Sequence, residues 1–369
     1  MHTYIHILGA IVRQRDSIST VTTAAAYATT PTDGWEIDPA ELELGQELGQ
    51  GAFGRVITGF YKKKRVAIKV LKESIPDLYR EDLLREIALL KSIGIHPCIV
   101  SMLGASTVKE PIALVMEYMP YGNLLEFLRF NRELVCIHCM TDPMTNQKEV
   151  WEITSKCLIS WVRQIAVAME YLSSKQYVHR DLAARNILLG INKSVKLCDF
   201  GLARLIFHGD PHYFRRTNGR LPFKWMALES IKDRLYTSKS DVWSFGILLW
   251  EIATFGAAPY PNIPVGELYR YLGEGYRMPQ PYNCSEELYQ LMYSCWSTSP
   301  DDRPTFSDLR CKLETMLTKD VEYLDLDLAN FQASFLACDG RDDKDGVELH
   351  KESFIEDNNV FEGLNLESV

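Results

Sequence analysis

The chain has 369 residues, 46% of them apolar and 24% charged, a composition typical of a globular protein large enough for two lobes around a shared cleft. Its formal net charge of −9 is unevenly distributed, because residues 319–369 contain 14 acidic and 4 basic side chains and the rest of the chain is almost neutral. No stretch provides the basic surface that binds phosphate backbones, so we do not expect nucleic acid as a partner.

The 9 cysteines are odd in number and scattered, which is typical of reduced thiols in a cytosolic setting. Cys136, His138 and Cys139 have the spacing of metal ligands, but no second Cys/His pair follows at zinc-site distance, so we interpret them as loop residues. Residues 1–12 are apolar but interrupted and too short to span a bilayer. We expect no membrane span in this chain.

The residue pattern of the first third of the chain predicts a leader and a small lobe. Residues 13–34 are rich in Ser, Thr and Ala without apolar periodicity, and residues 1–34 are interpreted as a flexible leader. From residue 35 to about 119, short β-type runs such as 66–71 and 112–116 surround one helical pattern at 80–93. This pattern predicts a mostly β lobe with one helix.

The next part predicts a larger helical lobe, over about residues 120–317. Its long helical patterns cover residues 158–172, 240–254, 285–296 and 306–317. A polar excursion at 131–156 predicts an insert loop rather than a domain. The overall fold class is therefore α+β with two lobes. Residues 318–369 have too few clustered apolar side chains to pack and are expected to be disordered in isolation.

A glycine-rich motif lies near the start of the small lobe. Residues 49–56 read GQGAFGRV, the G-x-G-x-x-G-x-V pattern in which glycines let the backbone approach phosphates. A dinucleotide-binding turn would require a helix directly after the glycines. A strand-like run follows instead, and a second strand then carries Lys69. This order is what a hairpin that covers ATP requires.

Lys69 lies between Ile68 and Val70 of that second strand, where an unpaired ammonium would be costly to bury. It therefore requires an acidic partner. In the helical pattern that follows, Glu86 lies beside the apolar stripe to which Leu83 belongs, and it can face the cleft. We predict the ion pair Lys69–Glu86, with Lys69 holding the α- and β-phosphates.

Residues 179–186 read HRDLAARN and form a polar segment between apolar runs, which is hard to explain as core. Asp181 can accept or orient the proton of an attacking hydroxyl, and Asn186 can bind magnesium. Asp199 begins the triplet DFG and provides a second metal ligand. Because phosphoryl transfer depends mainly on positioning and charge neutralisation, these residues indicate a reaction that uses ATP and Mg²⁺.

Together these motifs resemble the protein kinase family, in particular the receptor tyrosine kinases of the fibroblast, platelet-derived and vascular growth factor receptor groups. The resemblance covers about residues 35–317 and implies the two-lobed protein kinase fold. Two segments indicate tyrosine as the acceptor: residues 183–185, AAR, replace the Lys-containing sequence of serine/threonine kinases, and residues 221–226, LPFKWM, resemble the tyrosine-accepting loop. A phenol reaches farther than an alkyl hydroxyl, so its platform must lie lower and support a ring.

The resemblance also assigns individual positions. Met116 would guard the back of the adenine pocket, the backbone of residues 117–119 would pair with adenine, and Val56, Ala67 and Leu188 would enclose the base. The complete ATP-binding set is Gly49, Gln50, Gly51, Ala52, Phe53, Gly54, Val56, Ala67, Lys69, Met116, Glu117, Tyr118, Met119, Asn123 and Leu188. The catalytic set is Asp181, Arg185, Lys69 and Glu86, and the metal ligands are Asn186 and Asp199.

The resemblance predicts further structural contacts. His179 would stack with Phe200 in the apolar column between the lobes, and Asp241 would hold the backbone of the catalytic loop. Glu229 and Arg303 would form the buried pair that closes the activation segment.

One position departs from the family pattern, and another varies among members of the family. Leu228 stands where the family usually has proline, for which we expect a modest effect. Cys198, before the DFG triplet, is interpreted as a small core residue.

Two tyrosines are candidate phosphorylation sites. Residues 202–229 resemble an activation loop in which phosphate on Tyr213, about −1.5 to −2 in charge, would pair with Arg180 and Arg204 and order the loop. In the tail, Tyr323 follows an acid and precedes apolar residues, and it resembles a docking site for phosphotyrosine-reading signalling proteins. The alternative, in which Tyr323 caps the last helix against the lobe, remains open.

The sequence therefore predicts a protein tyrosine kinase that acts on protein substrates and, in a transient homodimer, on Tyr213 of a second copy. A pseudokinase scaffold is disfavoured because Lys69, Glu86, Asp181 and both metal positions hold the required residues. A soluble non-receptor kinase is the second alternative. Residues 35–37 resemble the segment just inside the membrane of these receptors, so we favour a receptor fragment at the inner face of the plasma membrane.

Overall fold

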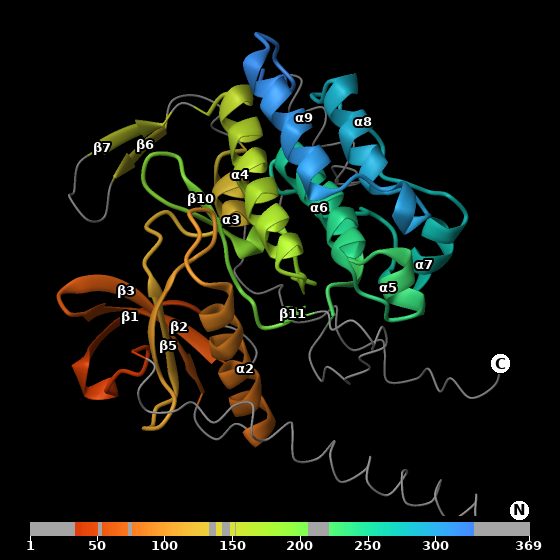
Figure 1. Ribbon diagram of the computed structural model, residues 1–369. Coiled ribbons are helices and arrows are strands. Elements are labelled where there is room, and N and C mark those ends of the chain that lie inside the picture. The colour runs from red at the N-terminus through yellow and green to blue at the C-terminus, as the bar shows by residue number, and fades with distance from the viewer. Residues whose placement is uncertain are drawn as a thin grey trace, which may run out of the picture. The chain divides into compact units, whose positions relative to one another are not determined.

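The computed structural model describes residues 34–50, 54–72, 76–132, 138–141, 148–151, 153–205 and 221–327 (Figure 1). The chain divides into two compact units, Met1–Asp339 and Gly340–Val369, and all described residues belong to the first. Within that unit a sheet with one long helix precedes a larger set of helices. The predicted two-lobed α+β fold is confirmed.

The small lobe is built on a five-stranded antiparallel sheet in the order β1-β2-β3-β5-β4. The strands are β1 (Leu42–Gln50), β2 (Gly54–Tyr61), β3 (Lys64–Leu71), β4 (Met102–Ser106) and β5 (Ala113–Glu117). Along β3, Val66, Ile68 and Val70 are buried, so the residues between them lie on the other face. Since β3 is the central strand, those residues are held firmly in place.

Helix α2 (Asp77–Ile93) lies beside this sheet (Figure 1). Leu83, Ile87 and Leu90 recur at helical spacing and are buried, which fixes the face that the helix turns inward. The helix ends at Gly94, whose positive φ of 78° suits a residue without a side chain.

The large lobe surrounds α6. Its helices are α3 (Leu124–Phe130), α4 (Ser155–Ser174), α5 (Leu228–Lys232), α6 (Ser238–Ala253), α7 (Val265–Gly273), α8 (Glu286–Cys295) and α9 (Phe306–Thr318). All α6 side chains from Ser240 to Ala253 are buried. Several helices begin at a residue whose side chain accepts a backbone N–H, including Thr154, Thr237 and Thr305. The predicted helical patterns correspond to α4, α6, α8 and α9.

Short strands and 3-10 helices complete the described chain. They are β8 (Tyr177–Val178), β9 (Ile187–Leu189), β10 (Val195–Leu197), β11 (Arg204–Leu205), η1 (Pro39–Glu41), η2 (Ala184–Asn186), η3 (Phe223–Trp225) and η4 (Pro300–Asp302). Strand β9 pairs with β10, and β8 pairs with β11. Residues 179–186 therefore connect β8 to β9, each of which is paired with another strand. Asp199 lies just after β10.

The predicted insert contains a hairpin. Strands β6 (His138–Thr141) and β7 (Lys148–Trp151) pair antiparallel within the predicted range 131–156. Cys136 lies outside the described residues, so the Cys136, His138 and Cys139 set cannot be placed as a group.

The beginning of the acidic tail packs against the large lobe. Tyr323 and Leu324 are only 2% and 1% exposed, and their backbone N–H groups both donate to Oγ of Ser155, each at 3.0 Å. Leu324 also forms a β-bridge with Cys284. Tyr323 and Leu324 therefore belong to the packed core and Leu326 packs partly buried against it, although all three lie within the range 318–369 that was expected to be disordered in isolation.

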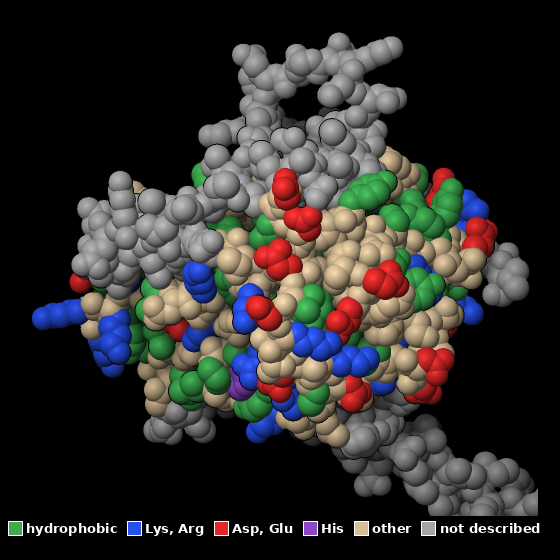
Figure 2. All heavy atoms as spheres, turned by 90° about the horizontal axis from the view of Figure 1, so that it is seen from above, with side chains coloured by type: hydrophobic (Ala, Val, Ile, Leu, Met, Phe, Trp, Pro, Cys, Tyr) green, Lys and Arg blue, Asp and Glu red, His purple; other side chains and the backbone are tan. Residues whose placement is uncertain are grey.

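The described surface carries both signs of charge. On the face shown in Figure 2, acidic and basic side chains are interspersed rather than separated into single-sign areas. Among the described helices, none combines the length and the apolar character that crossing a membrane requires.

Candidate active site

Lys69 joins the sheet, α2 and the loop after β10. Its Nζ lies 2.8 Å from Oε2 of Glu86 and 3.3 Å from Oδ1 of Asp199, so the predicted pair with Glu86 is present. Burial alone would lower the pKa of Lys69, but the carboxylates of Asp199 and Glu86 outweigh it and raise that pKa above its usual value. Lys69 therefore stays charged within the site.

Asp199 is held beside Lys69 with part of its carboxylate open. Lys69 lowers the pKa of Asp199, and the Asp199 side chain is 48% exposed. Its backbone has a positive φ of 58°. The preceding Cys198 contacts Asn186 O through Sγ at 3.2 Å, and burial raises the pKa of its thiol well above the usual value. Cys198 thus remains a protonated packing residue.

Asp241 of α6 anchors the loop at residues 179–186. Its two carboxylate oxygens accept the backbone N–H of His179 at 2.7 Å and of Arg180 at 2.9 Å, as the resemblance predicts. Arg180 has a positive φ of 68°, a conformation that these hydrogen bonds help to hold. The buried His179 ring packs edge-on against Phe200, with ring centroids 5.1 Å apart.

Asp181 is oriented by two side chains from its own loop. Its Oδ1 accepts from Arg185, and its Oδ2 accepts from Nδ2 of Asn186 at 2.8 Å. Nδ2 of Asn186 also donates to the backbone oxygen of Asp181 at 2.7 Å. The side-chain nitrogen Nδ2 of Asn186 is therefore engaged with Asp181. The side-chain oxygen Oδ1 of Asn186 is the atom that could bind a cation.

These residues fit a magnesium nucleotide. Asn186 and Asp199 offer the oxygen ligands that Mg²⁺ prefers, and the backbone N–H of Cys198 donates to Asn186 O at 2.9 Å, which ties the two ligand positions together. Lys69 adds a positive charge beside Asp199 that suits phosphate oxygens.

The positions predicted around adenine lie on adjoining elements. Ala67 of β3 is paired with Met116 of β5, and Leu188 of β9 forms a β-bridge with Asn123. The Asn123 side chain caps α3 by accepting the N–H of Glu126 at 2.9 Å, a structural contact that the sequence did not predict.

The segment after β5 is anchored by Glu117. Its carboxylate accepts from Nζ of Lys196 at 2.7 Å and from the N–H of Ser101 at 2.6 Å. Tyr118 is half-buried and has the Arg65 guanidinium 4.4 Å from its ring centroid, whereas Met119 is buried. With the Glu117 side chain engaged in this way, the backbone of the segment is the part suited to adenine.

The glycine-rich motif lies at the β1–β2 turn. Gly49 pairs with Val56 and Gln50 with Arg55, whereas Gly51, Ala52 and Phe53 lie outside the described residues. A Cβ at Gly54 would lie 2.9 Å from the carbonyl oxygen of Val70, so only glycine fits there without a shift. Since strand β2 rather than a helix follows, the dinucleotide-binding alternative is excluded.

Residues 221–226 meet the Asp181 loop through a contact that the sequence did not predict. The Arg185 guanidinium lies 4.3 Å from the ring centroid of Trp225, whose Nε1 donates to Oε2 of Glu251 at 2.9 Å. The backbone N–H of Ala184 donates to the same oxygen at 3.0 Å. Burial raises the pKa of Glu251 to about 7. An acid within the otherwise apolar run of residues 247–253 was the available sequence signal.

A buried ion pair closes the segment after residue 226. Arg303, with a fully buried side chain, donates from Nη1 and Nη2 to the two carboxylate oxygens of Glu229 at 2.7 and 2.8 Å. Leu228, which replaces the usual proline, is buried at the start of α5. The predicted pair thus forms in spite of that departure.

The two predicted phosphorylation sites differ in what the structure describes. Tyr213 lies outside the described residues. Of the two arginines expected to bind its phosphate, Arg180 stacks on Tyr236 at 4.4 Å and Arg204 donates to Gly201 O at 3.0 Å. Tyr323 is buried, so its hydroxyl can be phosphorylated only after the segment leaves the lobe.

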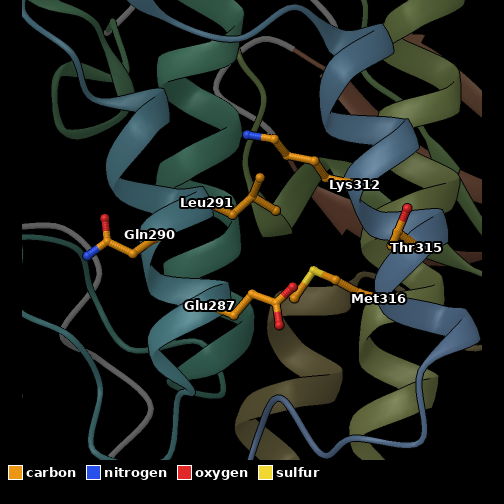
Figure 3. A pocket seen from close by; sticks show the side chains of 6 residues that line it. All are labelled: Glu287, Gln290, Leu291, Lys312, Thr315 and Met316. Carbon is orange, nitrogen blue, oxygen red and sulfur yellow. The ribbon is translucent and has the colours of Figure 1, made fainter.

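A surface pocket lies between α8 and α9, apart from these residues. It is lined by Glu287, Gln290, Leu291, Lys312, Thr315 and Met316 (Figure 3). None of the predicted ATP, metal or catalytic residues contributes to it. We do not assign it to the reaction.

Comparison with known proteins adds a family match. Residues 42–313 match the model of the family described as protein tyrosine and serine/threonine kinase. The chain is 44% identical over 319 residues to fibroblast growth factor receptor 1 of Pleurodeles waltl, covering 84% of this chain and 39% of that receptor. It is 44% identical over 305 residues to fibroblast growth factor receptor 1 of Xenopus laevis, covering 80% and 37%. The chain thus spans well under half the length of these relatives.

Proposed function

We propose that this chain, which belongs to the family of protein tyrosine and serine/threonine kinases, transfers the γ-phosphate of ATP to tyrosine hydroxyls. The observation that carries this proposal is that Lys69 contacts Asp199 and Asn186 contacts Asp181, while the backbone hydrogen bond from Cys198 to Asn186 places the two pairs next to each other. Positioned charge of this kind supplies most of the rate enhancement in phosphoryl transfer.

The roles follow from the contacts. Lys69, held by Glu86, would bind the α- and β-phosphates. Asn186 and Asp199 would hold Mg²⁺, which when bound would neutralise charge on the phosphate oxygens. Asp181 accepts the phenolic proton as the tyrosine oxygen bonds to the γ-phosphorus. The bond from that phosphorus to the β–γ bridging oxygen breaks, and ADP leaves.

Tyrosine is the proposed acceptor because of residues 183–185 and 221–226. Arg185 contacts both Asp181 and the Trp225 ring, so the acceptor loop and the base are held as one surface. A phenol can extend across such a platform, whereas a shorter alkyl hydroxyl ends before the base.

The test is incubation with ATP and Mg²⁺ followed by mapping of phosphotyrosine. Asp181→Asn is the control, because it removes the proton acceptor while keeping the shape of the side chain. We expect tyrosine phosphorylation by the parent chain and at least a hundredfold less by the variant. Nucleotide binding without transfer by the parent would favour the pseudokinase scaffold.

The two named relatives are growth factor receptors, so we propose that this chain is the kinase portion of a receptor at the inner face of the plasma membrane. A transient homodimer would then phosphorylate Tyr213 in trans, and Arg180 and Arg204 would bind the phosphate. Tyr213→Phe should lower the rate after preincubation with ATP. Equal rates for variant and parent would contradict this step.

Phosphorylated Tyr323 would recruit phosphotyrosine-reading proteins after the tail segment leaves the lobe. A phosphopeptide of residues 318–328 should capture such a partner, and the unphosphorylated peptide should not. Equal capture by both peptides would contradict a docking role for phosphorylated Tyr323. The packing of Tyr323 against the lobe would then be its remaining role.

A further inference from the structure

Glu251 carries a carboxylate at the centre of the large lobe. It lies on α6 between Trp250 and Ile252 and is 1% exposed. Its carboxylate oxygen Oε2 accepts hydrogen bonds from two neutral N–H groups, Ala184 N at 3.0 Å and Trp225 Nε1 at 2.9 Å. A buried carboxylate is costly, so its presence here requires a reason beyond packing.

The two donors belong to the two loops that meet at the reaction site. Ala184 lies in η2, next to Arg185, and Trp225 lies in η3 of the acceptor loop. A contact path therefore runs from Glu251 to the Trp225 ring, from that ring to the Arg185 guanidinium at 4.3 Å, and from Arg185 to Oδ1 of Asp181.

The same helix holds the acceptor loop a second time. Oγ of Ser244 donates to the backbone oxygen of Trp225 at 2.7 Å. Ser244 and Glu251 are two helical turns apart and share one face of α6. The backbone and the ring of Trp225 are thus both fixed from this rigid helix, whereas Lys69 and Glu86 lie on β3 and α2.

We propose that Glu251 is a positioning residue for the tyrosine acceptor: by holding Trp225 and Ala184 on one oxygen, it keeps the acceptor loop aligned with Asp181. This inference rests on the proposed tyrosine kinase activity and adds a specific role to it. The Glu251 carboxylate contacts Trp225 of the acceptor loop and not Lys69, Glu86 or Asp199, so its removal should affect the peptide more than the nucleotide.

The experiment compares Glu251→Leu with Glu251→Gln in the full chain, using a tyrosine peptide and ATP. Leu removes the acceptor for both N–H groups, whereas the carbonyl oxygen of Gln can accept both. We expect Glu251→Leu to lower kcat/KM for the peptide by about tenfold or more, with KM for ATP within about twofold, and Glu251→Gln to restore most of the loss.

Two further variants keep the test decisive. Trp225→Phe deletes the Nε1–H donor from a half-buried position, and it should reproduce the peptide defect. It replaces Glu251→Leu as the test if that variant does not fold. Thr254→Val removes another buried polar group, at the C-cap of α6, where the Thr254 hydroxyl donates to Trp250 O at 2.7 Å. This variant should change neither KM.

If the parent is active and both the Glu251→Leu and the Trp225→Phe variants keep its KM and kcat for the peptide, the positioning role of Glu251 is contradicted. The proposed kinase activity is not. Equal losses toward peptide and ATP also contradict it, because they indicate a general structural role. A parent that binds ATP but phosphorylates no tyrosine contradicts the proposed function, and this inference with it.

Discussion

At the residue scale, the charge of Glu251 links the site to pH. Burial raises the pKa of Glu251 to about 7, against the hydrogen bonds of Trp225 and Ala184 and the charges of Arg185 and Arg129, which lower it. In the unfolded chain the pKa is near the ordinary 4.5. Between these values the folded state keeps a proton that the unfolded state has released. The free energy of unfolding therefore falls as pH rises through this window.

Glu251→Gln should remove this pH dependence. Relative to the variant, the parent is expected to lose about 3 kcal/mol of unfolding free energy between pH 4.5 and pH 8. Urea unfolding of both chains at several pH values measures the difference. Glu267→Gln, at an exposed position of α7, is the matched control and should follow the parent. A difference between parent and Glu251→Gln that stays constant with pH would contradict the argument.

Substitution of Lys69 should abolish kinase activity without unfolding the chain. Lys69→Met leaves the carboxylates of Glu86 and Asp199 without their shared cation and removes the charge for phosphate. We expect phosphotyrosine formation to fall at least about a hundredfold. Lys64→Met makes the same chemical change at an exposed position of the same strand and should keep the parent rate. Retained activity in Lys69→Met would remove Lys69 from the proposed mechanism.

At the scale of elements, one ion pair joins α5 to the loop before α9. Arg303→Met leaves the Glu229 carboxylate, 11% exposed, without its cation, and is expected to cost about 3–5 kcal/mol of unfolding free energy. Arg270→Met is the control, since Arg270 pairs with Glu267 and Glu274 at the surface and such pairs contribute about 0–1 kcal/mol. Denaturant unfolding distinguishes the two. Similar small losses in both would show that the buried pair is dispensable.

The elements that the sequence predicted well are those with a clear period. Helices α2, α4, α6, α8 and α9 bury one or more faces at helical spacing, and strand β3 alternates, so their existence followed from the residue pattern. Strand β1 is mostly exposed and forms through its pairing with β2, which periodicity does not reveal. The short helix α3 and the hairpin β6–β7 were missed because so few residues carry too little pattern.

The same distinction applies within the site. The Lys69–Glu86 pair could be predicted because each residue lies on an amphipathic element whose inner face was known. The contacts of Glu251 could not, because its partners lie 26 and 67 positions away along the chain and depend on how the loops pack on α6. The sequence also left two roles open for Tyr323, since burial of an isolated tail segment depends on the surface that receives it.

At the scale of the whole described unit, the tail segment at residues 319–327 contacts the large lobe through several backbone hydrogen bonds, and one hydroxyl accepts two of them. Oγ of Ser155 accepts the N–H groups of both Tyr323 and Leu324 at 3.0 Å, and Ser285 N donates to Tyr323 O at 2.9 Å. The proposed phosphorylation of Tyr323 must break these contacts. Docking of the segment therefore competes with access to the tyrosine.

Ser155→Ala should accelerate phosphorylation of Tyr323. Loss of the acceptor leaves two N–H groups unpaired in the docked state, at about 1–3 kcal/mol each, so the undocked population and the rate should rise about tenfold or more. To separate access from catalysis, both substrates carry Asp181→Asn and the parent chain acts as the enzyme in trans. Phosphate at Tyr323 is followed by mass spectrometry over time.

Ser174→Ala, at the other end of α4, is the matched control because the Ser174 hydroxyl donates only to Tyr171 O in its own helix. It should leave the rate at Tyr323 unchanged. If Ser155→Ala and Ser174→Ala give the same rate as the parent substrate, undocking does not limit the reaction. The segment would then detach readily by itself, and the buried position of Tyr323 would not restrain its use as a docking site.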